Sequence, residues 1–266
     1  MDNITLGRYI PLDSPVHRLD PRAKIGAMLL MLIAIFIPAG WIGYAIIFAV
    51  VTFMVFLSKL SFTYIWKSMK PMLFMLVFLL IINVLVVHTG TVWLELGPIK
   101  VYSDAVTQTL YIVVRLLLMI MITTCLTATT KPLDMTLGIE DLLQPFEKIG
   151  VPSHEIAMLI SIALRFIPDL IDETGRIMKA QESRGVDLKE GKLNEKIMAI
   201  LSLIVPLFVS AFQRAEDLAN AMEARGYQPG ARRTRYKVLK LKGPDYLLLA
   251  GAVLVLACMI WLAYFK

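Results

Sequence analysis

Long apolar runs alternate with short polar segments along this chain. A helix needs roughly 20 apolar residues, with about 17 to 25 as the working range, to cross a hydrocarbon core of about 30 Å. Five runs qualify or nearly do, and they cover residues 25–37, 41–57, 72–87, 105–127 and 246–264. The first is short and is separated from the second by Pro38, Ala39 and Gly40, which interrupt a helix. The pattern therefore predicts about five transmembrane helices.

The composition agrees with a membrane-embedded chain. Hydrophobic residues make up 58% and charged residues 18% of the 266 positions, and the mean hydropathy is +0.69. An ordinary soluble domain has roughly 45–50% apolar and about 25% charged residues. We therefore interpret the chain as an integral membrane protein.

The basic residues collect on one side of the predicted membrane topology. If the N-terminus lies in the cytoplasm, 24 of the 27 Lys and Arg residues fall in cytoplasmic segments. Lys100 and Lys266 fall outside, and Arg115 lies within the fourth predicted span. Cytoplasmic loops carry such an excess of positive charge, so we predict a multi-pass protein of the cell (cytoplasmic) membrane with a cytoplasmic N-terminus. Because the net charge of +6 follows this topology, it gives no support to nucleic-acid binding.

Two further apolar runs, 156–171 and 197–212, are predicted to stay outside the membrane. Crossing as a hairpin would put the six basic residues between positions 176 and 196 on the outer side, against the charge rule. Each run is short and continues into a charged segment, and its apolar residues recur at the three-and-four spacing of one helix face. We predict two long amphipathic helices at about 153–183 and 194–224, the first capped by Ser153.

The expected fold is an all-α integral membrane protein with about five transmembrane helices and two long amphipathic cytoplasmic or interfacial helices. Residues 1–130 would form a bundle of four spans, residues 131–245 the cytoplasmic region, and residues 246–266 the C-terminal transmembrane helix. Pro168 and Pro206 lie in the middle of the long helices and should kink them. Such kinks are either tolerated irregularities or a means of turning each helix from the membrane into the cytoplasm.

The two long helices are predicted to end on the same short motif, in QESRGVD and MEARGYQPG. In each, a small residue precedes an arginine and a glycine follows it: Ser183, Arg184 and Gly185 in the first, and Ala224, Arg225 and Gly226 in the second. The glycine can supply the left-handed residue that ends a helix, which leaves the arginine as the only large group at the tip. A guanidinium there can pair bidentately with carboxylates, although ordinary capping also places cations and glycines at helix ends. Because the motif recurs on two matching helices, we favour two docking tips.

Other candidate chemical groups are isolated. Arg115 would be costly inside a span unless it is paired or faces the protein interior, so it is either a functional residue or half of a structural pair. The cysteines and histidines stand alone in the sequence, at Cys125, Cys258, His17, His88 and His154. Neither metal-ligand spacing nor a G-x-x-x-x-G-K-[ST] phosphate loop occurs, so we expect no catalytic residue, no bound cofactor and no metal in this chain.

The segment HRLDPRAK before the first span, the two arginine tips, the run AMEARGYQPGARRTRYK and the final span together resemble the transmembrane T component of energy-coupling factor transporters, the CbiQ/EcfT family. These are ABC-type importers of vitamins and transition metal ions. The resemblance covers essentially the whole chain, and its paired arginine motifs are fairly specific. It implies a membrane scaffold that transmits conformational change from two ATP-binding subunits to a membrane-embedded substrate-binding S component, for uptake of vitamins or related micronutrients.

By that resemblance, the two long helices are coupling helices. Ser183, Arg184 and Gly185 would dock one ATP-binding subunit and Ala224, Arg225 and Gly226 the other, in a homodimer or a heterodimer. ATP and Mg would be bound by those subunits, so this chain would not hydrolyse ATP by itself. The apolar helix faces would contact the S component through Ile156, Leu159, Ile160, Ala163, Ile167, Ile200, Ile204 and Phe208.

Two alternatives remain open at this point. The chain could be the T component of a metal-dedicated transporter for cobalt or nickel. A self-contained secondary transporter would need polar residues facing each other at mid-membrane, and the predicted spans offer only Arg115, Asn83 and a few hydroxyl groups.

Overall fold

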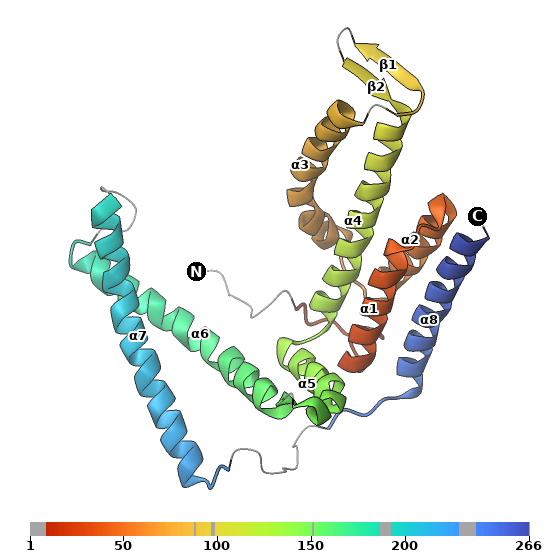
Figure 1. Ribbon diagram of the computed structural model, residues 1–266. Coiled ribbons are helices and arrows are strands. Elements are labelled where there is room, and N and C mark those ends of the chain that lie inside the picture. Colours follow the sequence, from red (N-terminus) through yellow and green to blue (C-terminus); the bar gives the residue numbers. More distant parts are fainter. Residues whose placement is uncertain are drawn as a thin grey trace. The chain divides into compact units, whose positions relative to one another are not determined.

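The computed structural model describes residues 9–87, 89–96, 99–150, 152–186, 193–228 and 238–265. Its elements follow in the order α1 (Pro21–Phe36), α2 (Gly40–Leu57), α3 (Phe62–Val86), β1 (Val92–Leu96), β2 (Ile99–Tyr102), α4 (Ser103–Thr129), α5 (Pro132–Leu143), the 3-10 helix η1 (Gln144–Ile149), α6 (Ser153–Ser183), α7 (Leu193–Ala224) and α8 (Gly243–Tyr264) (Figure 1). Helices account for nearly all of this regular structure, which confirms the predicted helical membrane fold. His88 lies outside the described residues.

A short antiparallel β-hairpin, formed by β1 and β2, lies between α3 and α4 and was not predicted. Val92 is opposite Tyr102, and Glu95 is opposite Lys100. Apolar and polar residues alternate in VWLEL and in part of IKVY, as the period of two along a strand requires. Such short strands escape a search for apolar runs of roughly 20 residues.

Among the described residues, four helical segments have the length and hydropathy to cross a membrane: Gly40–Leu57, Ser103–Thr129, Asn194–Ala224 and Gly243–Tyr264. A fifth is counted if Thr63–Lys70 and Phe74–Val86, which meet at 49°, form one bent span. These segments recover four of the predicted spans, in α2, α3, α4 and α8. The first predicted span became α1, whose 16 residues fall short of the roughly 20 that a full crossing needs.

The helix α7 also meets these criteria, although the charges beside it predicted a helix outside the membrane. Only 6% of its most apolar window is buried within the chain. The criteria of length and hydropathy take no account of the charged residues that flank a helix. The cytoplasmic or interfacial position of α7 therefore stays a prediction.

The chain divides into two compact units: a bundle unit of residues 7–138 and 239–266, and a hairpin unit that includes residues 139–238. In the bundle unit, α1, α2, α4 and α8 lie side by side (Figure 1) and share one apolar core. Each of these helices contributes a large hydrophobic side chain that is fully buried: Ile35, Ile47, Leu118 and Met259. The three regions predicted from the sequence, 1–130, 131–245 and 246–266, stay a prediction.

Polar residues within the bundle unit are paired with each other. Arg115 of α4 donates from Nη2 to the Tyr44 hydroxyl oxygen of α2 at 3.0 Å, and its guanidinium lies 5.3 Å from the centre of the Phe36 ring. Asn83 Nδ2 of α3 donates to Thr109 Oγ1 of α4 at 3.0 Å. An intramembrane arginine needs such partners, so the structure favours the structural interpretation of Arg115.

A network of backbone and carboxylate hydrogen bonds joins the first turns of α1 and α8. Asp20 caps α1, because its Oδ1 accepts from the Arg22 N–H at 2.9 Å while Pro21 occupies the first helical position. Asp245 of α8 is only 2% exposed, and its Oδ1 accepts from the Asp20 N–H at 2.8 Å. Its Oδ2 accepts from the Lys242 N–H at 2.6 Å. The buried carboxylate of Asp245 thus connects the N-terminal ends of α1 and α8.

The end of α4 is tied to the same place by a buried lysine. Lys24 of α1 is 6% exposed, and its Nζ donates to the Thr129 carbonyl oxygen at 3.0 Å and to Thr130 Oγ1 at 3.3 Å. These bonds satisfy both the ammonium group and a carbonyl at the helix end, where no intrahelical partner exists. The segment HRLDPRAK therefore joins three helices of the bundle unit.

We predict that Asp245→Ala lowers the free energy of unfolding by about 2 kcal/mol or more, because each hydrogen bond to a charged group contributes about 1.5–3 kcal/mol. Thermal unfolding of the full-length protein in detergent measures the change. Asp13→Ala is the matched control, since Asp13 pairs with Arg18 at the surface, where both side chains are more than 70% exposed. Equal melting temperatures for Asp245→Ala and the unmodified protein would contradict the assignment.

Candidate functional site

The hairpin unit is built on α6 and α7, whose bounds agree with the predicted 153–183 and 194–224 to within one residue. The prediction that Ser153 caps α6 is wrong: Pro152 is the N-cap, and the Ser153 hydroxyl donates to the Glu147 carboxylate of η1. A carboxylate within reach is a stronger acceptor for the hydroxyl than its alternatives, so the side chain turns away from the helix. His154 Nδ1 lies 2.9 Å from Glu140 Oε1, which anchors the same turn to α5.

Polar side chains fix α6 and α7 in an antiparallel arrangement. Glu173 of α6 accepts a hydrogen bond from Ser210 of α7 at 2.8 Å and forms an ion pair with Arg214. Eight residues further along α6, Gln181 Nε2 donates to the Ser202 carbonyl oxygen at 3.2 Å. The position on α6 increases from 173 to 181 while the position of its partner on α7 decreases from 210 to 202, so the two helices run in opposite directions.

The Glu173 pair is well placed to hold the two helices together. The side chains of Glu173 and Arg214 are 19% and 31% exposed, so they are more shielded from water than an ordinary surface pair. Arg214 also approaches Asp169 at 3.9 Å, one turn earlier on α6. Opposite charges at these positions are visible in the sequence, but their pairing depends on a register that the sequence alone does not reveal.

The eight residues expected to contact an S component all lie on exposed surface. They are Ile156, Leu159, Ile160, Ala163, Ile167, Ile200, Ile204 and Phe208. Leu159 and Phe208 are each 62% exposed. Apolar surface of this extent needs a membrane or a protein partner to cover it.

The two arginine motifs form the same helix cap. After α6, the Gly185 N–H donates to the Glu182 carbonyl oxygen at 3.0 Å and the Val186 N–H to the Gln181 carbonyl oxygen at 3.0 Å. After α7, the Gly226 N–H donates to the Glu223 carbonyl oxygen at 2.8 Å and the Tyr227 N–H to the Met222 carbonyl oxygen at 3.0 Å. Both are Schellman caps, with the glycine at C′ and the arginine at the C-cap position.

The backbone angles explain why each arginine is followed by glycine. Gly185 has φ +83° and Gly226 has φ +73°, in the left-handed region that other residues rarely adopt. A methyl group added at either glycine would have nothing within 4 Å. The predicted helix-ending role of both glycines is therefore supported by the structure.

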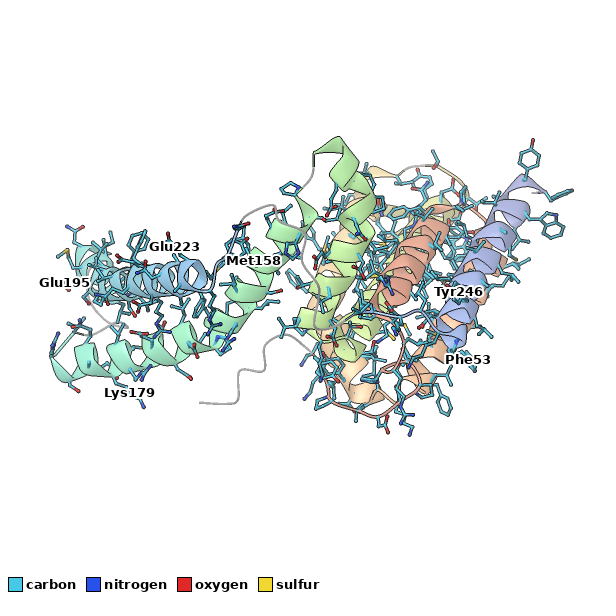
Figure 2. The ribbon with its side chains drawn as sticks, turned by 90° about the horizontal axis from the view of Figure 1, so that it is seen from below. Phe53, Met158, Lys179, Glu195, Glu223 and Tyr246 are labelled. Carbon is cyan, nitrogen blue, oxygen red and sulfur yellow. The ribbon has the colours of Figure 1, made fainter. Side chains whose placement is uncertain are left out.

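The caps present their arginines to the surroundings. Arg184 and Arg225 are exposed, as are the small residues Ser183 and Ala224 before them. Neither guanidinium forms an ion pair with another described residue. In Figure 2, the labelled Lys179 and Glu223 mark the C-terminal parts of α6 and α7. The six residues expected to dock partners are thus two exposed tips.

The antiparallel arrangement separates these tips. Arg184 lies beside the start of α7, whereas Arg225 follows its end. With 32 residues, α7 is about 48 Å long at about 1.5 Å per residue. Arg225 is also eleven residues beyond Arg214, the last residue of α7 that bonds to α6 through a described side chain. The structure does not bring the two motifs together into one site.

Two further expectations concern the mid-helix prolines and metal binding. Pro168 and Pro206 lie inside continuous helices, and a kink at either remains a prediction. Within the described residues, no group of three or more His, Cys, Asp and Glu side chains could hold a metal ion.

Comparison with known proteins gives full-length matches. The sequence model of the CbiQ family, described as "Cobalt transport protein", matches residues 13–236. A protein of Listeria innocua serovar 6a named energy-coupling factor transporter transmembrane protein EcfT is 42% identical over 262 residues, which cover 98% of this chain and 99% of that protein. Proteins of the same name from Macrococcus caseolyticus and Bacillus subtilis are 44% and 42% identical with the same coverage. The matched regions contain both arginine caps.

We predict that Glu173→Ala loosens the hairpin unit, because it leaves Arg214 without its principal partner and removes the acceptor of Ser210. Amide hydrogen exchange in α6 and α7 should become at least several-fold faster, since the free energy of local opening falls. Glu216→Ala is the matched control, because Glu216 is an exposed carboxylate on α7 outside this contact. The pairing would be refuted by identical exchange rates in the two variants.

Proposed function

We propose a coupling function for this chain, which belongs to the CbiQ/EcfT family of energy-coupling factor transporter transmembrane proteins. It is a multi-pass membrane component of a transporter. In the proposal, it joins two ATP-binding subunits to a membrane-embedded S component and transmits conformational change between them. The cell membrane, with the N-terminus in the cytoplasm, is the setting that its basic residues support.

The two identical arginine caps are the observation that carries this proposal. Each cap ends a long helix on an exposed guanidinium with small neighbours and a fixed backbone. A guanidinium in a groove can bind a carboxylate through two parallel hydrogen bonds, which a lysine cannot reproduce. Two such tips, held apart by α7, suit two ATP-binding subunits better than one binding site.

The hairpin unit can act as a lever between these subunits and a membrane partner. ATP binding and hydrolysis would change the distance between the two docked tips. Because Glu173, Ser210 and Arg214 link α6 to α7, a displacement of one tip is passed to the other helix. The exposed apolar residues of α6 and α7 would then transmit the movement to the S component.

The S component is proposed to cover the apolar surface that α6 and α7 leave exposed. Ile156, Leu159, Ile160, Ala163 and Ile167 lie on α6, and Ile200, Ile204 and Phe208 on α7. A surface made of apolar side chains imposes few directional requirements, since it carries few hydrogen-bonding groups. Such a surface suits a partner that can be exchanged for another.

Vitamins or related micronutrients are the proposed cargo, carried by the S component. A second candidate is a metal-dedicated transporter, which the description of the matching family as "Cobalt transport protein" favours. Uptake of labelled riboflavin, folate and cobalt by cells that express the complete complex separates the two. Uptake of cobalt alone would support the metal-dedicated type.

We predict that the double variant Arg184→Ala/Arg225→Ala abolishes ATP-driven uptake while the protein still inserts into the membrane. Removing one partner of a buried, hydrogen-bonded charge pair costs about 2–5 kcal/mol, so the loss of two should release the ATP-binding subunits. Co-purification in mild detergent and uptake by whole cells are the two measurements. Arg184→Lys/Arg225→Lys should retain only part of the binding, because lysine keeps the charge without the bidentate geometry.

Arg176→Ala is the matched control, since Arg176 is an exposed arginine on α6 that lies two turns before the cap. It should leave both uptake and co-purification unchanged. Normal uptake by the double alanine variant would contradict the assignment of the two tips as docking sites for the ATP-binding subunits.

A further inference from the structure

The bundle unit contains a large cavity that the proposed coupling function does not use. Its volume is about 990 Å³, and it lies between α1, α2, α4 and α8. Ligand pockets commonly measure about 300–1,000 Å³, so this one is at the upper end. Its walls are mostly apolar and include Met31, Val51, Ile122 and Val255.

The cavity occupies only one end of the four helices. Along α8 it extends from Pro244 to Val255, eleven residues or about 16 Å at about 1.5 Å per residue. On α2 and α4 it touches only the last turns, from Val50 and Ile122 onward. One leaflet of a hydrocarbon core of about 30 Å is about 15 Å deep. The cavity therefore matches the depth of a single leaflet and gives no passage through the membrane.

Basic residues lie at the end of the cavity where the helices begin or finish. Lys242 precedes α8 and Lys59 follows α2, and both side chains are exposed. Four basic and two acidic residues line the cavity, which gives it a net charge of +2. Arg18 is paired with Asp13, and Lys24 with carbonyl and hydroxyl oxygens. Lys59 and Lys242 are exposed, and although Lys59 is close enough to Asp13 to help lower the pKa of that carboxyl, Asp13 already has Arg18 as its partner, so Lys59 and Lys242 are the cations available to a ligand. The distribution of Lys and Arg predicts that this end is cytoplasmic.

The cavity borders side chains that are suited to lipid. Phe53 of α2, labelled in Figure 2, is 61% exposed, and Leu247 of α8 is 77% exposed. In a membrane protein such residues face hydrocarbon. A ligand with an acyl chain can therefore enter from the bilayer, whereas a fully polar ligand would have to displace apolar contacts.

We propose that this cavity binds an anionic phospholipid of the cytoplasmic leaflet, with its acyl chains along the apolar walls and its phosphate at Lys59 and Lys242. Acyl chains gain little by moving from the bilayer into an apolar cavity, because both surroundings are equally apolar. The selectivity must therefore come from the headgroup. Basic pockets between transmembrane helices on the cytoplasmic side are suited to anionic headgroups.

The backbone at Lys59 adds an independent reason to assign it a role. Its φ is +55°, and among the described residues it is the one non-glycine residue with positive φ. Glycine would occupy this position without strain. The backbone conformation here favours glycine, which has no side chain, yet the position carries a lysine directly at the charged end of the cavity.

The test is binding of phosphatidylglycerol and phosphatidylcholine to the delipidated full-length protein, measured by native mass spectrometry. The unmodified protein should prefer phosphatidylglycerol. Lys59→Gly combined with Lys242→Gln should bind it about 25-fold more weakly, about fivefold for each cation, since a basic residue at an anionic headgroup contributes about 1 kcal/mol and 1.4 kcal/mol is tenfold. Lys59→Gly removes backbone strain, so loss of folding does not explain a weaker affinity. Lys67→Gln/Lys70→Gln, two lysines of α3 that do not line the cavity, should leave the affinity unchanged.

A second variant tests the apolar part of the cavity. Gly251 of α8 lines the cavity, and a Cβ atom added there would meet nothing within 4 Å, so Gly251→Leu adds apolar bulk at an open position of the cavity wall. It should reduce the binding of both lipids at least tenfold. Equal affinity of the unmodified protein for the two lipids would overturn the proposal, as would unchanged phosphatidylglycerol binding in Lys59→Gly/Lys242→Gln. Loss of the lipid when the partner subunits bind would also overturn it and would assign the cavity to a protein surface.

Discussion

The contact of Glu173 with Ser210 and Arg214 decides what the two long helices can do. Together with the hydrogen bond from Gln181 to the Ser202 carbonyl oxygen, it joins α6 to α7, and a single helix is a weak unit unless its side chains pack on a neighbour. With it, they run antiparallel, which places Arg184 near the start of α7 and Arg225 past its end. The same contact leaves apolar residues of both helices exposed to a membrane or a partner. The antiparallel pairing thus separates the two tips, and the apolar faces of both helices stay exposed in the same arrangement.

In the bundle unit, charged side chains likewise hold helices together, but here they bond to backbone groups at the helix ends. Asp245 and Lys24 are buried at the ends of α1, α4 and α8, where backbone groups have no intrahelical partner. Their hydrogen bonds give partners to the Asp20 N–H, the Lys242 N–H and the Thr129 carbonyl at these helix ends. The apolar cavity adjoins this network, and its charged residues lie at the same helix ends. A site for an anionic lipid there would connect the stability of the bundle to the composition of the cytoplasmic leaflet.

The spacing of apolar residues and the positions of helix-ending glycines predicted most of this fold. The bounds of α6 and α7 followed from apolar spacing, and the caps followed from the glycines at positions 185 and 226. The β-hairpin was missed because its strands are shorter than any membrane span. The cap at Ser153 was wrong because Glu147, six residues earlier, competes for its hydroxyl group. Pairs such as Glu173 with Arg214 or Arg115 with Tyr44 depend on tertiary register, which local patterns do not contain.

The most direct test of the coupling account is site-specific photo-crosslinking in the complete complex. A photoreactive amino acid is placed at position 184 or 225, and at position 176 as the control, and the crosslinked partners are identified by mass spectrometry. Positions 184 and 225 should each crosslink to an ATP-binding subunit, to different polypeptides where the two subunits differ, and position 176 should not. Crosslinks from both tips to the S component or to lipid, with no ATP-binding subunit captured, would contradict the account.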